Sequence, residues 1–173
     1  GNKAEAGLLG LDGFSPTVVL TGSDTSLHEI IMQVAGRGHR IALGAFRRVV
    51  KETSDARVIL ANFVHALGTQ VSFTALSNAV HSVDERLARW LLMVHDRSDG
   101  DELALTHGFL ALMLSVRRPT VTTSIHVLEG KGFIRAERGV ITIRDRRAME
   151  DFARDAYGKP EEEYRRLLGT PAE

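Results

Sequence analysis

Residues 105–140, with the short apolar run that follows them, constrain the fold more than any other part of the chain. The glycines at positions 130 and 132 are signals that end a helix, and Gly139 separates two short β-type runs. The order helix, three-residue turn, helix and hairpin predicts a winged helix-turn-helix. Its expected pieces are a helix over 105–114, a turn over 115–117, a helix over 118–129, and strands over 133–136 and 140–143.

Local signals indicate where the two helices begin. Thr106 is a suitable N-cap for the first helix, because its hydroxyl can accept a hydrogen bond from a backbone N–H of the first turn. Pro119 is tolerated only in the first turn of a helix, so the second helix should start near Arg117 or Arg118. The buried face of this second helix is then expected to consist of Val121, Ile125 and Leu128.

The opposite side of the second helix carries small hydroxyls and an arginine, which suit a DNA groove. Arginine can bond guanine O6 and N7 in a bidentate way, and threonine can bond phosphate or contact a thymine methyl. A solvated polar face is the alternative for this helix taken alone, but the order of elements around it favours DNA. The residues on this side are Arg118, Thr120, Thr122, Thr123 and His126.

Charge is unevenly distributed along a chain whose net charge is zero. Residues 117–147 hold eight Lys and Arg against three acidic residues, a net charge of +5, whereas residues 148–173 carry −3. The basic block coincides with the predicted helix-turn-helix and wing, as expected for contact with DNA phosphates.

The sequence offers little support for a metal site, an enzyme or a membrane protein. There is no cysteine, which excludes disulfides, cysteine-ligated zinc and cysteine-ligated iron–sulfur clusters. The acidic loop 95–102 lacks the spacing of a calcium site, and HExxH, GxSxG, P-loop and GxGxxG motifs are absent. No secretory signal or apolar run near 18 residues is evident. We therefore expect no catalysis, no metal, no cofactor, no membrane span and a cytoplasmic location.

The N-terminal third predicts a fragment of a β domain. Four short runs separated by turns are expected to be strands, and so few strands cannot close a sandwich or barrel alone. A short helix over 44–51 and a long helix from 56 to about 80 follow. The expected strands are 6–11, 17–21, 29–35 and 40–43.

The long helix has an apolar surface wider than one small neighbouring domain would cover, which indicates that part of it forms a helix-to-helix dimer seam. Burial of the whole helix within its own domain is the alternative. The expected seam residues are Leu60, Phe63, Val64, Leu67 and Val71.

Three more helices are expected around the helix-turn-helix. Ser82 should cap one that points Leu87, Trp90, Leu91 and Val94 inward, and Asp145 should cap another over about 146–156. A last helix over 161–168 should be supported by an ion pair between Glu162 and Arg166.

Several of these segments resemble the Crp/Fnr family of bacterial transcription regulators. The resemblance is most specific from position 82 to 145 and implies a mainly helical α+β fold with three parts: a partial cyclic-nucleotide-type β-roll (1–53), a dimerisation helix (54–81) and a winged helix-turn-helix domain (82–173). The segments that carry it are EAGLLG (5–10), VDERLARWLL (83–92), DGDELALTH (99–107) and RRPTVTTSIHVLEGKG (117–132).

The resemblance implies a homodimer that reads an inverted-repeat site in double-stranded DNA, with RNA polymerase as a further candidate partner. Three residues fall where the family reads bases: Arg118, Pro119 and Thr123. The positions expected near phosphate, including two basic residues of the wing, are Thr106, Arg117, Thr120, Thr122, His126, Lys131 and Arg138.

The sequence also departs from the family pattern. Ser115 stands at a turn position that is usually glycine, and Ser124 replaces a usually apolar residue. The arginine and small hydroxyl that hold a cyclic nucleotide's phosphate are missing, and the nearest stretch (26–30) presents Glu29 where a cation is needed. We therefore expect a DNA-binding transcription regulator that does not respond to a cyclic nucleotide. The alternative is a protein-interaction module that uses the winged helix as a scaffold.

Overall fold

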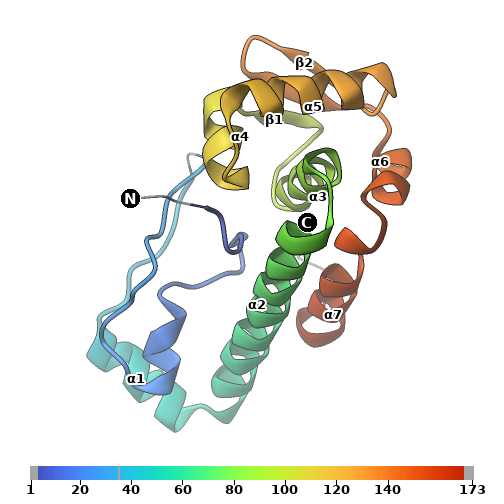
Figure 1. The fold of residues 1–173 in the computed structure, drawn as a ribbon. Helices are drawn as coiled ribbons and strands as arrows, with labels where there is room; N and C mark the ends of the chain where they lie inside the picture. The colour runs from blue at the N-terminus through green and yellow to red at the C-terminus, as the bar shows by residue number, and fades with distance from the viewer. Residues whose placement is uncertain (1–3, 35, 170–173) are drawn as a thin grey trace.

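The computed structural model describes residues 4–34 and 36–169 as a mainly helical α+β chain with one small sheet (Figure 1). From α1 onward, the expected helices and the expected strands of the hairpin begin close to where the caps and periodicities predicted. In chain order the elements are η1 (Thr17–Thr21), α1 (Leu43–Glu52), α2 (Ser54–Val80), α3 (Val83–His95), β1 (Glu102–Ala104), α4 (His107–Leu114), α5 (Arg118–Gly130), β2 (Ile134–Glu137), β3 (Val140–Ile143), α6 (Arg146–Ala153), η2 (Arg154–Ala156) and α7 (Lys159–Leu168).

The winged helix domain has a core formed by α3, α4, α5, α6 and the sheet. The expected buried faces are confirmed: Val121, Ile125 and Leu128 of α5 and Leu87 of α3 are at most 1 % exposed. The sheet is antiparallel in the order β1-β3-β2, and its three-residue strand β1, which the sequence analysis did not predict, pairs with β3. Ser82 caps α3 in a reciprocal capping box with Glu85, as the sequence led us to expect of Ser82.

The expected strands of the N-terminal segment are not formed. Among residues 4–34 and 36–42 the structure has no strand, and 17–21 forms the 3₁₀ helix η1 instead; the run 29–35 ends on a residue outside the described part. A strand needs a neighbour to bond its backbone groups, and four short runs without the rest of a β domain have too few neighbours. The part before η1 lies against α2, where the Leu8 N–H donates to Gln70 Oε1 at 2.6 Å, and the part after η1 runs toward α4 and back to α1 (Figure 1).

Helix α2 is long and apolar enough, by length and composition, to cross a membrane, which corrects the expectation that no such stretch exists. Only 22 % of that window is buried in the chain. A helix in the core of a soluble protein can meet the same criterion of length and composition. A helix that packs against a partner helix in a dimer also needs an exposed apolar surface of this kind.

The helix expected over about 146–156 is divided into α6 and η2 at Arg154, whose φ is 52°. Helix α7 then runs back along α2, as Figure 1 shows. The expected pair of Glu162 with Arg166 is wrong, because Arg166 bonds Glu163 at 2.7 Å. The two pairings use adjacent carboxylates, so helical spacing alone did not separate them.

The turn between α4 and α5 contains a strained residue. Ser115 adopts a left-handed conformation (φ 53°, ψ 45°), which costs a residue with a Cβ about 1 kcal/mol. We expect Ser115→Gly to raise the free energy of unfolding by about 0.5–1 kcal/mol, measured by urea denaturation. The control Ser115→Ala keeps the strain and should leave stability nearly unchanged; a glycine variant less stable than wild type would contradict this account.

Candidate nucleic-acid interface

Helix α5 is placed by its two neighbours, the turn and α4. The Thr106 hydroxyl accepts from the Phe109 backbone N–H at 3.2 Å and so starts α4, as predicted. The Val116 N–H donates to the Ala111 carbonyl at 3.0 Å and closes the turn. Arg117 is the N-cap of α5 and Pro119 lies in its first turn, so the helix begins where proline requires.

One side of α5 projects away from the core. Arg117, Arg118, Pro119, Thr120, Thr123 and His126 are all exposed. Within the described residues neither arginine makes an ion pair with a carboxylate, so both guanidinium groups are open to a ligand. Of the six polar residues of α5 and its N-cap that we expected to contact DNA, five are thus exposed together with Pro119.

Thr122 lies differently from the other threonines. It is half-buried, and its hydroxyl lies 3.0 Å from His107 Nδ1 and donates to the Arg118 carbonyl at 3.2 Å. This hydroxyl therefore ties α4 to α5. The Thr123 hydroxyl also bonds its own helix, at the Pro119 carbonyl (3.2 Å), but its side chain is exposed and its methyl group can face a groove.

The wing is a tight hairpin fixed to the end of α5. Arg138 and Gly139 have φ of 45° and 85°, the left-handed pair that a two-residue hairpin turn favours. The Glu129 carboxylate accepts from the Ala136 backbone N–H at 2.8 Å, which joins α5 directly to β2. This bond fixes the hairpin against α5, with the exposed Arg138 at the hairpin's tip.

Two wing cations already have intramolecular contacts. Lys131 is exposed and its ammonium lies 5.1 Å from the centre of the Phe152 ring, a cation–π contact that leaves the charge accessible. Arg135 bonds Glu137 on the same strand, so its charge is locally neutralised. Among the basic residues of the wing, Lys131 and Arg138 are therefore the better candidates for phosphate.

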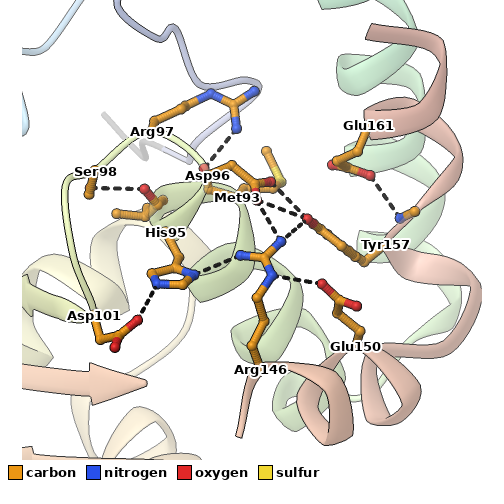
Figure 2. Close-up of polar contacts among 12 residues, drawn as sticks. Met93, His95, Asp96, Arg97, Ser98, Asp101, Arg146, Glu150, Tyr157 and Glu161 are labelled. Atoms are coloured by element: carbon orange, nitrogen blue, oxygen red, sulfur yellow. Dashed lines mark hydrogen bonds and ion pairs between the residues drawn. The ribbon is translucent and has the colours of Figure 1, made fainter. Parts of the chain in front are cut away.

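A polar network behind the interface was not predicted from the sequence (Figure 2). Its centre is Arg146, which bonds Asp96 at 2.6 Å, His95 Nδ1 at 2.7 Å, Glu150 at 2.8 Å and the Tyr157 hydroxyl at 2.5 Å. Burial opposes the charge of Arg146, but Asp96 and Tyr157 more than offset it and hold its pKa above the ordinary value. The network joins the end of α3, the start of α6 and the segment before α7.

A second group that the sequence did not reveal is the buried cation Arg89 of α3, which is 3 % exposed. Its Nε donates to the Ala156 carbonyl at 2.9 Å and its Nη2 to the Thr74 hydroxyl at 3.0 Å. Burial lowers the pKa of Arg89, and the carboxylates of Glu5 and Glu161 work against that shift. The periodicity of α3 signals that position 89 is buried, but no local signal identifies the partners of an arginine there.

The five expected seam residues do not share one environment. Phe63 is 4 % exposed and packs on Phe14, with ring centres 5.3 Å apart, so it belongs to the core of its own chain. Leu60, Val64 and Leu67 are half-buried, and Val71 is 38 % exposed. A partner helix could reach these four but not Phe63 in this arrangement.

The described residues contain no group of three or more His, Asp or Glu that could hold a metal ion. The acidic loop 95–102 is instead engaged in structural bonds, such as that of His95 Nε2 with Asp101 at 2.9 Å.

Residues 85–152 match the family model described as a Crp-like helix-turn-helix domain. No curated protein sequence matches the chain. Among solved structures, similarity extends to a Crp/Fnr-family transcriptional regulator from Eubacterium rectale, with 24 % identity, a TM-score of 0.47, and coverage of 65 % of this chain and 52 % of that one.

Two further structures are similar. A CRP/FNR-family regulator from Thermus thermophilus has 23 % identity and a TM-score of 0.49 over 54 % of this chain and 51 % of that one. A mutant of CooA from Carboxydothermus hydrogenoformans has 18 % identity and a TM-score of 0.52 over 64 % and 55 %. The chain thus spans about half the length of the solved structures that it matches.

Proposed function

We propose that this chain, which belongs to the Crp/Fnr family of transcriptional regulators through its Crp-like helix-turn-helix domain, reads an inverted-repeat operator as a homodimer. The observation that carries this proposal is the open face of α5, where Arg118, Pro119 and Thr123 stand free of the core. Family membership also makes a regulator, not an enzyme, the expected class of protein. Such a regulator acts inside the cell; we propose the cytoplasm, with RNA polymerase as a further partner.

The charge distribution supports this reading. The +5 block from 117 to 147 lies on α5, the wing and the start of α6, whereas the following segment is acidic. Arg118 is suited to guanine O6 and N7, and Thr123 to a thymine methyl. Arg117, Thr120, His126, Lys131, Arg138 and the α4 cap Thr106 are suited to the flanking phosphates. Thr122 is the weakest of these candidates, because its hydroxyl is already bonded.

A dimer would place one α5 in each of two successive major grooves. We propose that α2 supplies its seam through Leu60, Val64, Leu67 and Val71, with Phe63 as core support beneath them. The boundaries 1–53, 54–81 and 82–173 remain our division of the chain into sensory, dimerisation and DNA-binding parts. A cyclic nucleotide is not the expected effector, since 26–30 offers the carboxylate of Glu29 in place of a cation.

The test is selection of bound duplexes from random DNA at near-physiological salt. Recovery of an inverted repeat with half-sites about one helical turn apart would support a dimeric reader and supply the operator. Recovery of single half-sites would contradict the dimer. Recovery of nothing above background would favour the alternative, a protein-interaction module built on the winged helix.

Arg118→Ala is expected to weaken binding to the selected operator by about 1–3 kcal/mol and to relax the choice at one base pair of each half-site. The reason is loss of a bidentate contact to one base edge. Fluorescence anisotropy on the operator and its single-base variants measures both effects. Arg48→Ala, which removes the same charge from the exposed side of α1, is the control. A variant at position 118 that discriminates between bases as well as wild type does would contradict the assignment of Arg118 to a base contact.

A further inference from the structure

We propose that η2 and α7, together with the connecting residues 157–158, form a strap that holds the winged helix at a fixed angle on α2 and thereby sets the spacing of half-sites a dimer can read. This C-terminal strap (154–168) rests on the proposed function, since spacing matters only to a dimeric reader. It lies beyond the segment matched by the family model, which ends at 152. Figure 1 shows α6 beside α3 and α7 beside α2, joined by a short connection.

The strap is bonded along much of α2. Near one end, His81 Nε2 lies 3.0 Å from an Asp155 carboxylate oxygen. Farther along, Asn62 donates to the Leu167 carbonyl at 3.3 Å, and His65 faces Glu163 at 3.4 Å. Positions 62 and 81 are separated by roughly 28 Å of helix at 1.5 Å per residue. Contacts over such a length resist tilting of the strap on α2.

The strap is also bonded to the winged helix. The Tyr157 hydroxyl donates to Asp96 at the end of α3, at 2.8 Å, and accepts from Arg146 at the start of α6 (Figure 2). The buried guanidinium of Arg89 bonds the Ala156 carbonyl on one side and Thr74 of α2 on the other. The strap therefore makes direct hydrogen bonds both to α2 and to the winged helix, and so connects the two.

Without the strap, these bodies would be joined only by a short extended connection and by the bonds of Arg89 to Thr74 and to the Gln70 carbonyl of α2. His81 and Ser82, between α2 and α3, have φ, ψ of −95°, 150° and −63°, 161°, so small changes at two residues would swing the whole winged helix. A dimer must hold its two recognition helices about 34–36 Å apart, and one base pair of spacing changes their relative rotation by about 35°. A fixed angle thus confers preference for one spacing.

The test is insertion of two glycines between Gly158 and Lys159. This lengthens the connection but deletes no packing surface, and the inserted glycine before Lys159 can take over as the N-cap of α7. The matched control inserts two glycines after Gly169. Affinities are measured for the selected operator and for versions with a spacer one base pair shorter and longer.

Wild type and control should lose at least about tenfold in affinity on either change of spacing. The 158 insertion should bind the best duplex more weakly and lose less than about threefold on either change. An insertion variant that discriminates spacings as sharply as wild type would overturn the strap. Equal weakening on all three duplexes with unchanged ratios would do the same, because it would indicate a purely structural defect.

Calorimetry without DNA separates this proposal from the proposed function. Wild type and control should unfold in one transition, and the 158 insertion in two, because α2 and the winged helix would no longer be coupled. If the wild-type protein bound no duplex, the proposed regulatory function would fail. The number of unfolding transitions would still test whether the strap couples α2 to the winged helix. A single transition in the insertion variant would overturn the strap.

Discussion

Replacing Arg89 by methionine is expected to lower the free energy of unfolding by about 3–5 kcal/mol, the cost of removing one partner from a buried charge network. Methionine can fill much of the space but cannot bond the Ala156 carbonyl or the Thr74 hydroxyl. It also leaves the carboxylates of Glu5 and Glu161 without the cation that opposes the effect of their burial. Chemical denaturation followed by circular dichroism measures the loss.

The dependence of that loss on pH identifies its origin. Burial raises the pKa of Glu5 and of Glu161, and Arg89 works against the rise in both; without it both pKa values should rise further. A carboxyl whose folded pKa exceeds its unfolded value costs stability as the pH rises through the folded pKa. The deficit of the variant should thus be larger at neutral pH than at about pH 5.

Arg154→Met is the control, since the Arg154 side chain is 73 % exposed and its ion pair with Glu85 is a long contact of 3.4 Å. Its effect should stay within about 0.5 kcal/mol. A deficit at position 89 that is equally large at both pH values would mean that packing and hydrogen bonds, not the carboxylates, account for it.

Neutralising three candidate phosphate contacts together, as Arg117→Gln, Lys131→Gln and Arg138→Gln, should reduce affinity for all DNA sequences by about 10³-fold or more at 0.1 M salt. A dimer loses six contacts, so the slope of log affinity against log salt concentration should fall by about 5. The preference of the protein for its operator over single-base variants should be nearly unchanged, since we propose that these residues contact phosphates and not base edges. Titrations at four or more salt concentrations measure both quantities.

Arg40→Gln, Arg48→Gln and Lys51→Gln together remove the same charge from exposed positions of the N-terminal third and serve as the control. If only the net charge of the protein mattered, both triple variants would bind DNA more weakly by the same factor. If the substituted residues contact phosphates, only the first triple variant should bind more weakly. Should the first triple variant keep the wild-type salt slope, the winged helix would be a scaffold that does not contact phosphate.

The winged helix was predictable because its signals are local. Thr106, Pro119 and Ser82 indicated helix starts by short-range chemistry, and all three helices begin where these residues require. Periodicity then located the buried side of α5 without knowledge of its neighbours. Even the strained turn at Ser115 was visible, because a family glycine is replaced there.

The features that were missed depend on contacts between distant residues. Strand β1 has three residues, and its partner β3 lies nearly forty positions further along the chain. The sequence shows only that Arg89 belongs to an amphipathic helix. Its hydrogen bonds to the Ala156 carbonyl and the Thr74 hydroxyl become visible only in the folded structure. Phe63 fits an apolar stripe, but periodicity could not tell which neighbour covers it. The N-terminal strands failed for the same reason, since pairing partners are not a local property.

The two faces of α5 have separate roles. Val121, Ser124, Ile125 and Leu128 are at most 2 % exposed and hold the helix in place, whereas Arg118 and Thr123 contribute nothing to the core. Mutations at the latter positions can therefore accumulate at little cost in stability. A helix whose two faces are separated in this way can change the residues that meet a ligand in single steps, each through a fully folded intermediate.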